Sequence, residues 1–383
     1  MHPIIIIGSG MAAYTLAREF RKLDKETALT IITADDGDAY SKPMLSTALA
    51  QNKAPDQLIN ARVESMREQL DAQILTHRQV LAIDATAKQV QLQDQTLDYS
   101  QLVLALGADP VRPQLAGDAA DAVLSVNDLS DYARFRAAIV NARRVAILGG
   151  GLIGCEFAND LATAGYQVDI VHPQAYPLER LLPEAAATAL RDGLANLGVT
   201  WHLQRMAVAV DHHGDSLMLS LNDGTSIETD AVLSAIGLRP RVQLAQNAGI
   251  HAGRGIRVNR QLQTNVPGIY AIGDCAEVEG HVLPYVLPLM AQARALAVTL
   301  TGTPTGVAYP AMPVVVKTPA CPIAVAAPSV PDSATWAVDC QEDGICALYQ
   351  DANGQLLGFA LTGKAVQQRQ TLVKQLPPIL TMQ

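Results

Sequence analysis

The sequence is poor in aromatic residues and in cysteine. Phe, Trp and Tyr make up 4% of its 383 residues, and five residues are cysteine. These are Cys155, Cys275, Cys321, Cys340 and Cys346, and they form neither a Cys-x-x-Cys pair nor a zinc-ligand spacing. The pattern excludes a disulfide-built fold, predicts no metal site and favours a reducing cytoplasm.

The sequence also lacks an excess of basic charge and a long hydrophobic run. Its 37 acidic against 28 basic residues give a net charge of −9, which argues against nucleic acid as a partner. The most apolar stretch, residues 282–300, is interrupted by Pro284, Pro288, Gln292 and Arg294, so we expect no membrane span. Because no basic segment precedes the N-terminal isoleucines, we expect no signal peptide either.

The first fourteen residues combine a buried strand with a glycine-rich turn. Residues 4–7 are four isoleucines, which suit a strand buried on both faces of a parallel sheet. Gly8, Gly10 and Ala13 form a Gly-x-Gly-x-x-Ala motif at the start of a helix expected over residues 11–23. Gly8 permits the tight turn, Gly10 lets the backbone approach a pyrophosphate, and Ala13 lets helix and strand pack closely. An isolated motif of this kind also occurs as a purely structural turn.

A second copy of this plan begins at residue 144. Residues 144–148 predict a strand, Gly149, Gly151 and Gly154 complete a Gly-x-Gly-x-x-Gly motif, and a helix is expected over residues 155–164. The chain therefore contains an internal duplication. Two phosphate-binding turns predict two dinucleotides, and two dinucleotides favour electron exchange between them.

Acidic residues follow two of the expected strands. Asp35 or Asp36 comes after the strand of residues 28–32, where a dinucleotide fold binds a ribose hydroxyl. The alternative for either residue is a turn or a helix cap. Asp274 follows a buried strand that begins at Gly268, and we expect it to bind a sugar-alcohol hydroxyl.

Lys42 precedes Pro43, which favours an extended backbone, so we expect a fixed loop there rather than a helix. A lysine held in this loop could face the ring of a bound dinucleotide and stabilise negative charge on it. The alternative is an ordinary solvated lysine. We also expect a strand over residues 79–83 and a helix over residues 286–300, whose first N–H groups would lie near a ring carbonyl.

These patterns predict an α/β fold with two Rossmann-like dinucleotide-binding domains and a small α+β domain at the C-terminus. We place the first dinucleotide-binding domain at residues 1–110 together with 239–311, and the second at residues 111–238. The α+β domain takes residues 312–383. A chain of this length is too long for one ordinary core, which agrees with several domains.

The motifs together resemble the pyridine nucleotide–disulfide oxidoreductase superfamily over nearly the whole chain. The resemblance rests on both glycine turns, residues 104–107, residues 234–240 and Gly273-Asp274. It implies FAD on the first unit and on Asp274, and a nicotinamide dinucleotide on the second unit. Within the superfamily, residues 41–46, 155–160 and 313–322 are similar to the rubredoxin–NAD reductases of bacterial alkane-hydroxylating systems.

That closer resemblance implies electron transfer from NADH through FAD to the iron of rubredoxin, by a monomer. It implies catalytic roles for Lys42, Glu156 and Lys317, with Glu156 near the nicotinamide. The alternative for Glu156 is a first-turn helix glutamate favoured by the dipole. The cofactor-binding residues that the motifs and the resemblance assign are Ile7, Gly8, Ser9, Gly10, Ala13, Thr33, Ala34, Asp35, Lys42, Val80, Ala105, Gly107, Gly149, Gly151, Gly154, Glu156, Gly237, Asp274, Val286 and Lys317.

Three departures from superfamily patterns narrow the chemistry. The chain has no Cys-x-x-x-x-Cys pair for disulfide relay, and Lys42 stands where another branch carries a peroxide-reducing cysteine. His172 stands where NAD-specific relatives carry an acidic residue, and no basic cluster for a 2′-phosphate is nearby, so we still expect NAD. The alternatives are an NADH oxidase or peroxidase, a reductase of another small iron–sulfur protein, or a non-catalytic flavin sensor.

Overall fold

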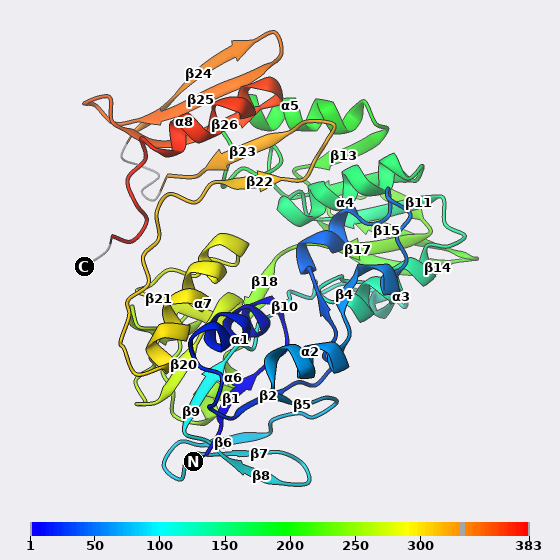
Figure 1. Cartoon of the computed structure of the whole chain (residues 1–383). Helices are drawn as coiled ribbons and strands as arrows, with labels where there is room; N and C mark the ends of the chain where they lie inside the picture. Colours follow the sequence, from blue (N-terminus) through cyan, green and yellow to red (C-terminus); the bar gives the residue numbers. More distant parts are fainter. Residues whose placement is uncertain (1, 329–333, 382–383) are drawn as a thin grey trace.

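Two parallel β-sheets and one antiparallel sheet form the framework of the molecule (Figure 1). The computed structural model describes residues 2–328 and 334–381. Helices cover the parallel sheets, and the antiparallel sheet near the C-terminus lies beside the second of them. The α/β class and the small α+β domain are confirmed.

The first parallel sheet has the strand order β20-β9-β1-β2-β5. Its strands are β1 (Ile4–Ile7), β2 (Leu29–Ile32), β5 (Gln73–Leu75), β9 (Gln101–Leu104) and β20 (Ile269–Ala271). Every residue of β1 is buried, as the run of isoleucines predicts for a central strand.

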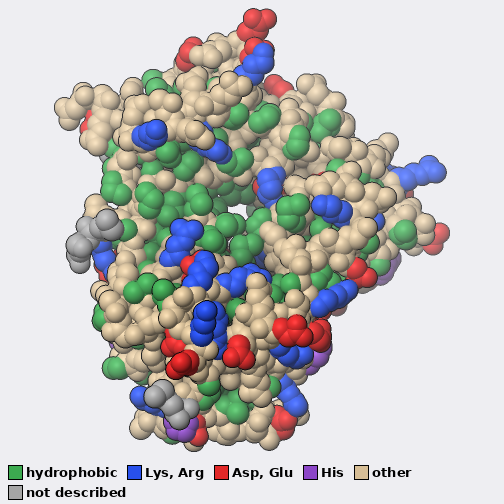
Figure 2. All heavy atoms as spheres, in the orientation of Figure 1, with side chains coloured by type: hydrophobic (Ala, Val, Ile, Leu, Met, Phe, Trp, Pro, Cys, Tyr) green, Lys and Arg blue, Asp and Glu red, His purple; other side chains and the backbone are tan. Residues whose placement is uncertain are grey.

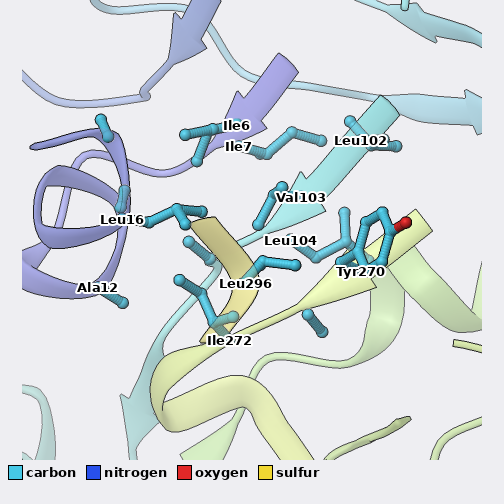
Figure 3. Packing of buried hydrophobic residues seen from close by; sticks show 14 of the residues in the cluster. Ile6, Ile7, Ala12, Leu16, Leu102, Val103, Leu104, Tyr270, Ile272 and Leu296 are labelled. Atoms are coloured by element: carbon cyan, nitrogen blue, oxygen red, sulfur yellow. The ribbon is translucent and has the colours of Figure 1, made fainter. Parts of the chain in front are cut away.

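Two helices bury their apolar faces against this sheet, α1 (Met11–Leu23) and α7 (Val286–Leu300). Figure 3 shows Leu16 of α1 and Leu296 of α7 converging on side chains of β1 and β9. Both leucines are fully buried, and each contributes about 1.5–3 kcal/mol through the apolar surface that it removes from water. This core fixes the first glycine turn, because the turn joins β1 to α1.

The second parallel sheet repeats the plan with the order β13-β12-β11-β17. Its strands are β11 (Arg144–Leu148), β12 (Gln167–His172), β13 (Val199–Leu203) and β17 (Ala231–Ser234). In both units the first strand of the unit pairs in parallel with the two strands beside it. The expected internal duplication is therefore present in the fold.

The third sheet is antiparallel with the order β22-β23-β26-β25-β24. Its strands are β22 (Val314–Val316), β23 (Ile323–Ala326), β24 (Thr335–Gln341), β25 (Gly344–Gln350) and β26 (Leu356–Thr362). The helix α5 (Glu184–Ala195) of the second unit contacts β25 and β26. One hydrophobic cluster accordingly runs from the second unit into this sheet.

The remaining strands form small sheets of two or three strands around this framework. The strands β10 (Ala108–Pro110) and β18 (Leu238–Pro240) pair where the chain crosses between the two parallel units. The other elements are β3 (Ala39–Tyr40), β4 (Ile59–Ala61), α2 (Val63–Leu70), β6 (Ala82–Asp84), β7 (Gln89–Gln91), β8 (Thr96–Asp98), α3 (Leu129–Ala138), β14 (Ala207–His213), β15 (Ser216–Leu221), β16 (Ser226–Thr229), α6 (Gln243–Asn247), β19 (Ile256–Val258), β21 (Ala276–Val278) and α8 (Arg369–Val373). Within the described parts of the chain, no helix has the length and hydropathy that crossing a bilayer requires.

Three local predictions were wrong. Residues Lys42–Thr47 form a 3₁₀ helix (η1) rather than a loop, because Pro43 sits in the first turn, where its missing N–H costs nothing. The strand expected over residues 79–83 begins only at Ala82. The helix expected to start at Cys155 starts at Leu152, and this helix, α4 (Leu152–Thr163), includes the motif's last glycine in its first turn.

Candidate functional site

One large cavity joins the two glycine turns. It has a volume of about 1590 Å³ and is lined by residues of both turns, of η1 and of the segment that leads into β22. Figure 2 shows hydrophobic side chains and several Lys and Arg side chains around a hollow near the middle of the view. The site is therefore built from all three sheets rather than from one domain.

The first glycine turn leaves room for a phosphate group. Gly8 has a φ of +113°, and a Cβ there would lie 2.3 Å from the carbonyl oxygen of Ala105. Gly10 is the N-cap of α1, and a Cβ there would meet no atom within 4 Å, so its open side faces the cavity. The residues present thus fit a dinucleotide pyrophosphate held at a helix N-terminus.

A carboxylate is held beside this turn by three donors. The Oδ1 atom of Asp35 accepts hydrogen bonds from the hydroxyls of Ser9 (2.9 Å) and Thr33 (2.5 Å) and from the backbone N–H of Gly37 (3.0 Å). Because all three donors use Oδ1, the Oδ2 atom remains for a ribose hydroxyl. Asp36 instead accepts the N–H of Asp38 in a turn. Asp35, which lines the cavity, is the better of the two candidates.

The second glycine turn repeats the geometry of the first. Gly149 has a φ of +106°, and a Cβ there would lie 2.7 Å from the carbonyl oxygen of Ala235. Gly151 is the N-cap of α4 and is open on its cavity side, as Gly10 is. A Cβ on Gly154 would lie 1.9 Å from the carbonyl oxygen of Gly149, so only glycine permits this close packing.

Glu156 on α4 ties together three distant parts of the chain. It is 7% exposed, and its Oε2 atom accepts hydrogen bonds from the Ser46 hydroxyl (2.6 Å) and the Lys317 ammonium (2.8 Å). Its Oε1 atom accepts the backbone N–H of Lys317 (3.0 Å). Lys317 also donates from Nζ to Ser46 (2.7 Å) and to the carbonyl of Pro43. Both ionisable groups are thus paired and fixed at the cavity wall.

Lys42 and Asp274 form a second charged pair on the cavity wall. The Lys42 Nζ and an Asp274 carboxylate oxygen are 3.7 Å apart. Burial lowers the pKa of the Lys42 ammonium, and the charge of Asp274 partly opposes this shift. Asp274 lies in a short 3₁₀ turn after β20, where Gln292 of α7 accepts the N–H of Gly273 (2.7 Å).

Two further polar residues of α4 hold neighbouring segments of the chain by hydrogen bonds, and the sequence analysis did not predict this role. Asn159 accepts the N–H of Ala320 (3.1 Å), and Asp160 accepts the N–H groups of Leu49 (2.8 Å) and Ala50 (3.0 Å). Burial raises the pKa of Asp160 to about 6, against the lowering effect of these hydrogen bonds. The sequence does contain a signal for this role. Asn159 and Asp160 lie three and four positions after Glu156 in an otherwise apolar helix, which puts the three polar side chains on one face.

Comparisons with known proteins identify the family. Residues 2–296 match the model of the pyridine nucleotide-disulphide oxidoreductase family. The chain belongs to this family. Residues 306–376 of this pyridine nucleotide-disulphide oxidoreductase match the model of the rubredoxin binding C-terminal domain.

Relatives agree over the full length. The protein is 53% identical over 382 residues to a rubredoxin-NAD(+) reductase of Alcanivorax borkumensis, covering 99% of this chain and 100% of the relative. It is 48% identical over 392 residues to a rubredoxin-NAD(+) reductase of Acinetobacter baylyi, covering 100% of both chains. The crystal structure of a ferredoxin reductase from Rhodopseudomonas palustris has the same fold, with a TM-score of 0.88 at 24% identity over 98% of this chain and 96% of that one.

The cavity of this oxidoreductase brings together nearly every residue that the sequence predicted for it. Ala13 and Gly154 are the exceptions, since both act in the packing of helix on strand. The cavity also includes residues that the sequence reasoning did not select, among them Ser46 and Glu179. The predicted residues that line it are Ile7, Gly8, Ser9, Gly10, Thr33, Ala34, Asp35, Lys42, Val80, Ala105, Gly107, Gly149, Gly151, Glu156, Gly237, Asp274, Val286 and Lys317.

Proposed function

We propose that this protein passes electrons from NADH through FAD to rubredoxin. The observation that carries the proposal is the single cavity into which both glycine turns open. A chain with one nucleotide site would need only one such turn, whereas two turns on one cavity bring two dinucleotides together. The match of residues 306–376 to a rubredoxin binding domain supports the choice of acceptor.

The first unit would hold FAD, and the second NADH. The first glycine turn and the N-terminus of α1 bind the FAD pyrophosphate, while Asp35 accepts a ribose hydroxyl. Asp274 would bind the sugar-alcohol chain of FAD, and Val286, the first residue of α7, lies on the cavity wall, where the N-terminus of this helix would face the flavin ring. FAD, when bound, accepts a hydride from NADH and releases electrons singly, as a one-iron partner requires.

The two lysines supply positive charge where the flavin becomes electron-rich. Lys42 and Lys317 both line the cavity, and each is held in place by a carboxylate. Because these charges are fixed before the reaction, they stabilise negative charge without reorganisation. Glu156 acts through Lys317, which it positions by two hydrogen bonds, and it shapes the side of the cavity that receives the nicotinamide.

We propose that rubredoxin docks at the apolar mouth of the cavity. Ile236, Val286, Leu287 and Val315 are exposed and line it, which suits the small apolar contact of a transient redox pair. We take rubredoxin to be acidic, so the net charge of −9 on this protein would repel it at long range. We therefore expect the rate of rubredoxin reduction to increase with ionic strength in a salt titration, and a steep decrease would contradict this docking surface.

We also propose the domain limits of residues 1–110 with 239–311, 111–238 and 312–383. Separate hydrophobic cores support the division between the two parallel units, although the second unit and the last sheet share one cluster. The five cysteines form no disulfide, which supports a cytoplasmic location. A monomer that supplies electrons to alkane hydroxylation completes the proposal.

The test is NADH-dependent reduction of a panel of acceptors under anaerobic conditions. We expect the FAD-loaded protein to reduce rubredoxin much faster than ferredoxin, peroxide or a disulfide. The oxidation of NADH measures the rate with every acceptor, and the loss of visible absorption measures the reduction of the two iron–sulfur proteins. Oxidation of NADH in air alone at the rate seen with rubredoxin would favour an oxidase and refute the proposal. Failure of the purified protein to bind FAD would refute it as well.

A further inference from the structure

His172 occupies the position at which NAD-binding folds usually carry an acidic residue, and the structure places a carboxylate directly behind it. The Nδ1 atom of His172 accepts the backbone N–H of Gly150 (3.0 Å), so the ring proton is on Nε2. That Nε2 donates to the carboxylate of Glu179 (3.0 Å). Both side chains line the cavity.

A similar arrangement occurs in the first unit, where Asp35 is the carboxylate that we expect to bind a ribose hydroxyl. The register of the strands makes Thr33 the counterpart of His172, since Gly8 donates to the carbonyl of Ile32 and Gly149 to that of Val171, each over 2.8 Å.

Ser9, between the first two glycines, bonds to Thr33 and to Asp35. In the second unit, Gly150 lies between Gly149 and Gly151. Its N–H donates to His172, which in turn donates to Glu179. In each unit, a residue of the glycine turn and a residue at the carboxyl end of the unit's second strand thus orient a carboxylate from further along the chain.

The local backbone is arranged to bring Glu179 to this place. Leu178, the residue before it, has a φ of +55°, which is costly for a residue with a side chain. Its N–H donates to the carbonyl of Gly150 (3.0 Å), and its side chain is buried in the core of the second unit. A Cβ on Gly150 would lie 3.0 Å from Cγ of the His172 ring, so a larger residue would crowd the ring in this position.

We propose that Glu179, oriented by His172, recognises the adenosine ribose of NADH and rejects the 2′-phosphate of NADPH. One carboxylate oxygen is engaged by His172, and the side chain is 25% exposed, so the other oxygen can accept ribose hydroxyls. A phosphate on the 2′-oxygen would meet a fixed negative charge. Glu179 is thus a specificity residue, and His172 is its positioning residue.

Arg180 is the nearby group that would favour NADPH, because its positive charge attracts a phosphate. It is exposed and also lines the cavity, so its guanidinium is available to a phosphate. The proposal requires the carboxylate of Glu179, and not Arg180, to decide the preference between the two nucleotides.

The inference rests on the proposed binding of NADH to the second unit, and binding measurements separate the two. The probes are ADP-ribose and 2′-phospho-ADP-ribose, which exchange no electrons, and their dissociation constants are measured by calorimetry on the FAD-loaded protein. The variants are Glu179→Gln, His172→Phe and Arg180→Gln. Glu184→Gln is the matched control, because it removes one negative charge from the same segment without contact to the cavity.

We expect the unmodified protein to prefer ADP-ribose, and Glu179→Gln to reduce this preference by about tenfold or more. His172→Phe should reduce it as well, and Glu184→Gln should leave it unchanged. A preference that stays within about twofold in Glu179→Gln, or that changes only in Arg180→Gln, overturns the inference. If neither probe binds to the unmodified FAD-loaded protein, the proposed function itself fails.

Discussion

Alanine substitutions in the two glycine turns should separate folding from nucleotide binding. Gly8→Ala places a Cβ 2.3 Å from the carbonyl oxygen of Ala105 at a φ of +113°. A left-handed backbone costs a residue with a side chain about 1–2 kcal/mol, and overpacking costs about 1–3 kcal/mol more. We therefore expect the protein without FAD to lose about 2–5 kcal/mol of stability.

Gly10→Ala is the matched variant two residues away. Its Cβ would meet no protein atom within 4 Å, and its backbone is extended, so the loss should stay below about 1 kcal/mol. The same methyl group would occupy the space of the pyrophosphate. We expect this variant to fold normally and to lose FAD affinity by at least about tenfold, since charge-assisted hydrogen bonds are lost.

The second turn supplies the corresponding pair for NADH. Gly149→Ala meets the carbonyl of Ala235 at 2.7 Å, whereas Gly151→Ala meets nothing within 4 Å. Thermal unfolding of the FAD-free variants and titration with FAD or NAD(+) would measure both effects. A Gly10→Ala variant that binds FAD as the unmodified protein does, or a Gly8→Ala variant of unchanged stability, would refute the reasoning.

Three further predictions concern the charged groups. Lys317→Met removes the ammonium that Glu156 and Ser46 fix, so stopped-flow measurements should show flavin reduction by NADH slowed by about tenfold, and an unchanged rate would contradict a role for this charge. Because burial lowers the pKa of Lys42, electron transfer to rubredoxin should decline at a pH below the ordinary lysine value of 10.5, and Lys42→Arg should remove that decline from the pH profile. Asp160 has its pKa raised from 3.8 to about 6 in the folded state, so its stabilising contribution is complete below pH 3.8 and is lost as the pH increases through 6. Relative to Asp160→Asn, the unmodified protein should lose about 2–3 kcal/mol of unfolding free energy between pH 4 and pH 7, as measured by denaturant titration. If the unfolding free energies of the two proteins depend on pH in the same way, the pKa of Asp160 is not raised.

The sequence predicted the parts of the site whose signals are local. Four consecutive isoleucines, the spacing of Gly8 and Gly10, and the apolar period of the helix after them all lie within about 20 residues. The second turn has the same signals, so both dinucleotide-binding units could be predicted from the sequence, whereas the strand order of each sheet came from the structure. The local steric rule for residues before proline gave a wrong prediction, because Lys42 begins a 3₁₀ helix rather than lying in an extended loop.

Only the tertiary structure decided which side chains meet in the cavity. Ser46 and Glu156 are 110 residues apart, and Glu156 and Lys317 are 161 residues apart, yet they share one network of hydrogen bonds. His172 likewise acquires its carboxylate from Glu179 through the turn at Leu178. Side-chain periodicity reports how a segment is buried, whereas such contacts depend on how three sheets pack against one another, and no short stretch of sequence encodes that packing.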